Sequence, residues 1–64
     1  MELEIAREII DQLRSKEIGH IEIKKEDFLT FRQVLVEQED YKYFHGIARQ
    51  GGNIFYEYLD SPRV

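Results

Sequence analysis

The sequence predicts a two-layer α+β domain in which two helices cover one face of a three-stranded sheet. Three observations predict this class: an amphipathic stripe near the N-terminus, a second helical repeat after residue 27, and two aromatic runs that flank a Gly-Gly pair. At 64 residues the chain has room for one domain, residues 1–64, with a thin core. The predicted element order is α-β-α-β-β.

The first helix is predicted from Leu3 to Leu13. Apolar residues such as Ile9 and Leu13 recur there at intervals of three and four, and charged residues occupy the opposite face. Gly19 is the predicted helix stop, because glycine adopts the left-handed C-terminal conformation without a Cβ penalty. His20, beside that stop, is expected to interact with the last carbonyl groups of the helix.

Residues 20–24 predict a short, half-buried strand, because Ile21 and Ile23 alternate with polar neighbours. A second helix is predicted over residues 28–38. Asp27 is its predicted N-cap, since a carboxylate accepts hydrogen bonds from the free N–H groups of the first turn. The acidic run at the other end opposes the helix dipole, so that end is expected to fray.

Residues 41–48 and 54–59 are rich in aromatic and β-branched side chains, and they flank Gly51-Gly52. Such a pair predicts a hairpin, because a primed turn requires positive φ at its central residues. The strand at residues 20–24 can lie beside either hairpin strand, and the sequence does not choose between the two orders. Residues 60–64 are expected to form a flexible tail, because proline cannot extend a ladder.

The hairpin register decides which side chains share a sheet face. A two-residue turn at Gly51-Gly52 places six side chains, Ile54 among them, together on a face that two helices in one layer cannot cover. The other five are the predicted partner-binding residues: Tyr43, His45, Ile47, Tyr56 and Tyr58. A three-residue loop would instead group Phe44, Ala48, Ile54, Tyr56 and Tyr58, with Phe55 and Leu59 opposite. An exposed aromatic face typically marks an interaction surface, although the same tyrosines can also build a core.

We therefore predict a non-enzymatic protein–protein interaction module that forms a homo-oligomer or serves as a subunit or regulator in a complex. The alternative is single-stranded nucleic-acid binding by the aromatic hairpin, because Lys42 and Arg49 lie among rings that can stack on bases. The net charge of −4 disfavours this alternative, since the whole molecule repels phosphate. The acidic run at residues 37–40 suggests contact with a basic protein instead.

No catalytic residue, cofactor or metal is predicted. His20 and His45 are the two histidines, the chain has no cysteine, and no spacing matches a metal-binding or nucleophile motif. We expect His45 to be a sheet-surface residue or an interface donor. The sequence shows neither the pattern of a secretory signal nor an apolar run of membrane length, so no membrane contact and a cytoplasmic location are expected.

Overall fold

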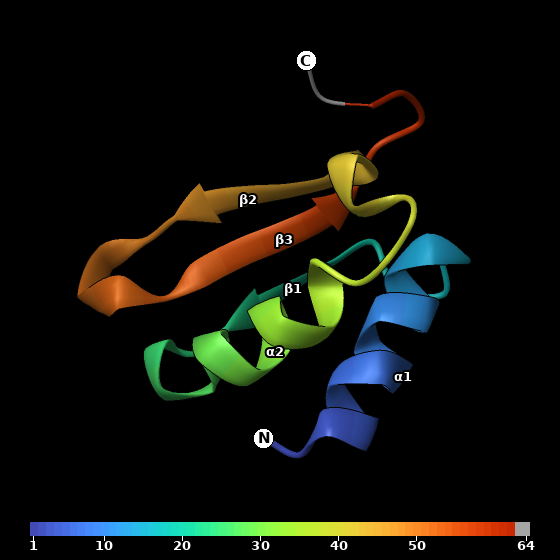
Figure 1. Ribbon diagram of the computed structural model, residues 1–64. Coiled ribbons are helices and arrows are strands. Elements are labelled where there is room, and N and C mark those ends of the chain that lie inside the picture. The colour runs from blue at the N-terminus through green and yellow to red at the C-terminus, as the bar shows by residue number, and fades with distance from the viewer. Residues whose placement is uncertain (63–64) are drawn as a thin grey trace.

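The computed structural model describes residues 1–62 and has two layers (Figure 1). Helix α1 spans Leu3–Arg14, strand β1 His20–Ile23, helix α2 Phe28–Leu35, strand β2 Phe44–Ala48 and strand β3 Ile54–Tyr58. Short 3-10 turns occupy Lys25–Asp27, Tyr41–Tyr43 and Gln50–Gly52. Within this range the predicted fold class, a small α+β domain with two helices and a three-stranded sheet, is confirmed. Residues 63 and 64 of the predicted tail lie outside the described residues.

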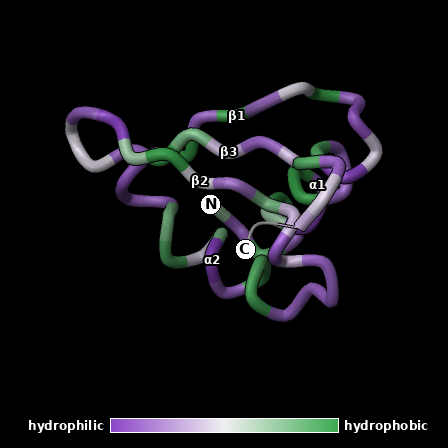
Figure 2. Tube along the Cα trace, turned by 90° about the horizontal axis from the view of Figure 1, so that it is seen from above, coloured by the Kyte–Doolittle hydropathy of each residue, from purple (hydrophilic) through white to green (hydrophobic). Residues whose placement is uncertain are grey.

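The central strand of the sheet is β3, and the strand order is β1-β3-β2. Figure 2 shows β3 between the other two strands, and both neighbours run antiparallel to it. Of the two orders that the sequence left open, the observed one places β1 beside β3. Strands β1 and β2 are therefore the edges of the sheet.

Both helices lie on one face of the sheet (Figure 1), and the buried side chains form one cluster between the two layers. Its buried members come from every layer: Ala6, Ile10, Leu13, Ile23, Phe31, Val34, Leu35, Phe44 and Tyr56. The three α1 members follow the i, i+4, i+7 spacing that the sequence predicts for a helix with one apolar face. The rings of Phe31 and Tyr56 pack with their centroids 4.9 Å apart and join α2 to the central strand. In the described part of the chain, neither helix is long and apolar enough to cross a membrane.

Helix α1 ends at Arg14, and the left-handed residue after it is Lys16 rather than Gly19. Lys16 has a φ of 67°, and its N–H donates to the carbonyl oxygen of Leu13 at 3.2 Å. This bond belongs to a Schellman-type ending. The predicted role of Gly19 is wrong because the helix has already ended when the chain reaches it. His20 begins β1 and stacks on the ring of Phe55.

Helix α2 is shorter than predicted, and Asp27 is not its side-chain cap. A 3-10 turn precedes the helix, so Asp27 already has a near-helical backbone and makes no capping hydrogen bond. Its carboxylate accepts instead from the ammonium group of Met1 at 2.8 Å. The helix ends at Leu35 rather than Gln38, and the N–H of Gln38 donates to the carbonyl oxygen of Leu35 in a tight turn.

The hairpin has a three-residue loop, formed by Gln50 and the two glycines. Phe44 pairs with Tyr58, and the N–H of Arg49 donates to the carbonyl oxygen of Asn53 at 2.8 Å to close the loop. Both loop glycines have positive φ, 80° and 87°. The predicted two-residue turn is therefore wrong, and the three-residue alternative is confirmed.

Candidate binding groove beside strand β2

The five residues predicted to share one partner-binding face lie on both faces of the sheet. Side chains alternate along a strand, so the observed register turns His45 and Ile47 outward and Tyr56 and Tyr58 toward the helices. Tyr56 is a core residue. Tyr43 precedes β2, and its ring stacks on that of Tyr58 with centroids 5.6 Å apart. The predicted aromatic face does not form, because a one-residue change of register moves every side chain to the other face.

The outer face of the sheet is largely polar. His20, Glu57 and His45 form a row across the three strands, since both histidines pair in register with Glu57. The Phe55 ring stacks on His20 at 4.8 Å and lies under the guanidinium of Arg49 at 4.7 Å. The Nδ1 atom of His45 is buried without a hydrogen-bond partner among residues 1–62. In the same range, no group of three His, Cys, Asp or Glu side chains is arranged to hold a metal ion.

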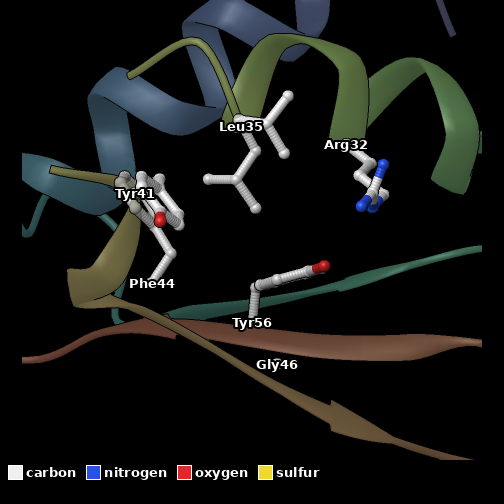
Figure 3. A pocket seen from close by; sticks show the side chains of 7 residues that line it. Arg32, Leu35, Tyr41, Phe44, Gly46 and Tyr56 are labelled. Atoms are coloured by element: carbon white, nitrogen blue, oxygen red, sulfur yellow. The ribbon is translucent and has the colours of Figure 1, made fainter. Parts of the chain in front are cut away.

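A groove of about 230 Å³ opens on the inner face, between helix α2 and the edge strand β2 (Figure 3). Its lining residues are Arg32, Leu35, Val36, Tyr41, Phe44, Gly46 and Tyr56. Figure 3 shows Tyr41 and Phe44 at one end, Arg32 at the other, and Leu35 and Tyr56 between them. Val36 is 49% exposed and Tyr41 46% exposed. The groove therefore has apolar walls that water can reach, with a cation at one end.

Gly46 lies on the floor of this groove. A Cβ atom at this position would lie 2.9 Å from Cε1 of Tyr56 and 3.3 Å from Cγ2 of Ile54. Real Cβ contacts are longer, so a larger residue fits here only if the Tyr56 ring moves. Glycine thus allows the Tyr56 ring to lie close to the β2 backbone.

The backbone of β2 is paired on one side only. The N–H of Leu59 donates to Tyr43 at 2.7 Å, and that of Arg49 donates to Asn53 at 2.8 Å, so these bonds fix the pairing at both ends of the strand. Hydrogen-bonded pairs alternate along an antiparallel ladder, which places the odd-numbered residues of β2 in bonds to β3. The N–H and C=O groups that point to the free edge therefore belong to Phe44, Gly46 and Ala48. Phe44 and Gly46 also line the groove.

A wider hollow of about 450 Å³, lined by Arg14, Gln38, Glu39 and Asp40, has polar groups that bind one another. The Arg14 guanidinium donates to both carboxylate oxygens of Asp40 and to the side-chain oxygen of Gln38, each at 2.8 Å. The Tyr58 hydroxyl donates to Asp40 at 2.9 Å. The Arg14 hydrogen bond, with the Tyr58 hydrogen bond and the Arg14 charge as smaller causes, lowers the pKa of Asp40 from 3.8 to about 2. Burial and the bond to Asp40 raise the pKa of Tyr58. This cluster joins α1 and β3 to the α2–β2 connection. Its role is therefore structural.

Most of the groove residues were not predicted from the sequence, although two signals for the groove are present in it. Leu29, Arg32 and Val36 recur at i, i+3 and i+7, on a face of α2 that points away from its core residues. Gly46 interrupts an aromatic strand, and an interior glycine often marks a close approach of backbone or ligand. Together these signals indicate a second apolar surface on α2 beside a strand with an open floor.

A family model described as YkzS-like protein matches residues 4–57, which include almost all of the helices and strands described above. The chain therefore belongs to the YkzS-like family. No curated protein and no solved structure matches it. The description of the family names no reaction, ligand or partner.

Proposed function

We propose that this member of the YkzS-like family is a non-enzymatic protein–protein interaction module that binds its partner along β2, in the groove beside α2. One observation carries the proposal: the groove with exposed apolar walls borders the edge at which Phe44, Gly46 and Ala48 present free backbone groups. Extended peptides bind such edges as an added strand. Main-chain hydrogen bonds then supply affinity, and pockets for alternate side chains supply specificity.

The geometry at Gly46 suits an added strand. A partner residue opposite Gly46 would exchange hydrogen bonds with it, and its side chain would point to the same sheet face, toward α2. That incoming side chain would enter the groove beside the Tyr56 ring, between Tyr41 and Leu35. The apolar lining then desolvates it, at roughly 25 cal/mol for each Å² of apolar surface removed from water.

Self-association is one form of this proposal, in which the β2 edges of two copies pair. Single-stranded nucleic-acid binding has less support. The hairpin tyrosines Tyr56 and Tyr58 point toward the helices, and Phe55 on the outer face already contacts His20 and Arg49. Glu57 on the same outer face would also repel phosphate.

The proposal can be tested by peptide selection. The full chain is immobilised, and short peptides that bind it are selected from a displayed random library. The enriched peptides should shift the backbone amide resonances of Val36, Tyr41 and Gly46 in NMR spectra. Ala48→Pro removes an edge N–H that is not used within the sheet, so it should weaken binding by about tenfold, the value of one net hydrogen bond. The matched control is Glu22→Pro, which removes an outward N–H from the opposite edge and should leave binding unchanged.

Two outcomes would contradict the groove as the binding site. In the first, the library yields no binder to the folded chain. In the second, the enriched peptides shift His45 and Ile47 on the outer face and bind Ala48→Pro as well as they bind the unaltered chain. Light scattering over a wide concentration range completes the test, since a dimer that Ala48→Pro converts to monomer would identify a second copy as the partner.

A further inference from the structure

We propose, building on the proposed function, that the groove takes an extended segment of a different protein with an acidic and an apolar residue in alternating positions. The acidic side chain pairs with Arg32. The apolar side chain packs against Tyr41 and Phe44. The segment itself lies along β2 and hydrogen-bonds to its free edge.

The charge of the lining favours an acidic group at one end of the groove. Arg32 is the charged residue among those that line it. Within residues 1–62, Arg14 pairs with Asp40 and Asp11, whereas Arg32 makes no hydrogen bond or ion pair. A guanidinium offers a planar fork that binds a carboxylate through two parallel hydrogen bonds. Beside an apolar wall such a pair is less screened than it would be in open water.

The order of the lining residues along the groove sets the spacing of the motif. Figure 3 shows Arg32 at the end of the pocket away from Tyr41 and Phe44. Side chains on one face of a strand recur at every second residue, about 7 Å apart. An added strand can therefore place one side chain against the two aromatic rings and the next one on the same face near Arg32. The connection that carries Tyr41 also bears the exposed carboxylates of Glu37 and Glu39, which disfavour an acid at that end.

A second copy of this chain fits the groove less well than such a segment. If two β2 edges paired, the strand entering the groove would have the sequence Phe-His-Gly-Ile-Ala, which contains no carboxylate. Arg32 would then remain without an acidic partner. The net charge of −4 also separates two copies at long range, since each repels the other.

Peptide selection tests this assignment. Three forms of the full chain are used in parallel: the unaltered chain, Arg32→Gln and Arg32→Glu. Peptides selected on the unaltered chain should carry an apolar residue and an Asp or Glu two positions away from it. Two changes should each weaken binding by about tenfold, as expected for a charge-assisted hydrogen bond. The first replaces the acid of a synthetic peptide with its amide, and the second is Arg32→Gln in the protein. Arg32→Glu should select Lys or Arg at the same position. Arg7→Glu, a charge reversal at an exposed site on α1, is the matched control and should leave the selected sequences unchanged.

The outcomes separate this inference from the proposed function. Peptides that bind the groove without preference for an acid, or with a preference that survives Arg32→Glu, would overturn the acidic segment and leave the interaction module standing. A dimer that fills the groove would likewise replace the different protein with a second copy. Failure of any peptide to reach the groove would overturn both. Because Arg32 is exposed, each variant should unfold at the same urea midpoint as the unaltered chain, which excludes loss of fold as the cause.

Discussion

Replacing Asp40 with asparagine should destabilise the fold at neutral pH and have almost no effect near pH 2. The Asp40 carboxylate accepts hydrogen bonds from Arg14 and from the Tyr58 hydroxyl. Asparagine has a similar size but no charge, so the substitution removes the ion pair and leaves the guanidinium with weaker partners. The three bonded residues belong to α1, the α2–β2 connection and β3. Loss of these bonds therefore weakens the contact between the helical layer and the sheet.

The magnitude follows from the pKa of Asp40, which Arg14 and, to a smaller extent, the Tyr58 hydroxyl lower from 3.8 to about 2. A shift of that size corresponds to about 2.5 kcal/mol at full strength. The Asp40 side chain is 24% exposed and that of Arg14 is 35% exposed. Screening by water therefore reduces the expected contribution to about 1–2 kcal/mol. Because the folded-state pKa lies below the unfolded one, this stability is present above about pH 4, halved near about pH 3 and lost as the pH falls through about 2.

Urea unfolding followed by circular dichroism measures this difference for the unaltered chain and Asp40→Asn across the acidic range. Asp60→Asn is the matched control. Lys16 lowers the pKa of Asp60 in a similar ion pair, but the Asp60 side chain is 91% exposed. The control should therefore keep the unaltered urea midpoint at every pH.

Two results would refute this reasoning about Asp40. One is an Asp40→Asn variant that is as stable as Asp60→Asn at neutral pH, which would mean that the part-buried Asp40 pair contributes no more than the exposed Asp60 pair. The other is a destabilisation that stays constant down to pH 2, which would mean that shape rather than charge is responsible.

Two further substitutions probe the groove floor and the phenol. Gly46→Ala should lower the free energy of unfolding by about 1–3 kcal/mol, because the new Cβ would lie 2.9 Å from the Tyr56 ring. The control is Gly19→Ala, where the new Cβ would meet open space. It should be neutral or slightly stabilising in the same urea assay. Tyr58→Phe should cost about 1 kcal/mol at neutral pH through the lost bond to Asp40. Burial raises the pKa of Tyr58, so the unaltered chain loses stability as the pH rises through that value. The variant should lack this alkaline loss in the same urea assay.

The helices and strands were predictable because their signals are local. Ile10 and Leu13 are buried where the helical spacing places them, and Ile23 is buried where strand alternation places it. The element ends were not predictable in the same way. Lys16 rather than glycine takes the left-handed position, and Asp27 binds the ammonium group of Met1 instead of capping α2. The Asp27 contact joins residues 26 positions apart, which no short window of sequence contains, whereas the Lys16 ending is a local backbone feature at a residue other than the expected glycine.

The hairpin register was left open between two alternatives, and the predicted site depended on the wrong one. A signal that favours the correct register is present in Glu57 and His45. A two-residue turn would place Glu57 on the same face as Phe44 and Ala48, whereas a three-residue loop pairs Glu57 with His45 on the outer face. Burying a carboxylate against the helices is costly, so the polar pair itself favours the three-residue loop. Weighing the polar residues of the hairpin as heavily as its tyrosines would have placed Tyr56 in the core.

The α2–β2 connection links the stability of the fold to the shape of the groove. Its first residue, Val36, and Tyr41 near its end form walls of the groove. Asp40 directly precedes Tyr41 and is held by Arg14 from α1 and by Tyr58 from β3. The ion pair therefore restricts the backbone that carries Tyr41. Within the connection, the N–H of Tyr41 donates to the carbonyl oxygen of Gln38 at 3.2 Å and Tyr41 begins a 3-10 turn, so the ion pair adds to these backbone bonds. We infer that the Asp40 charge matters to binding as well as to folding, since it fixes the wall against which the apolar residue of a bound segment would pack.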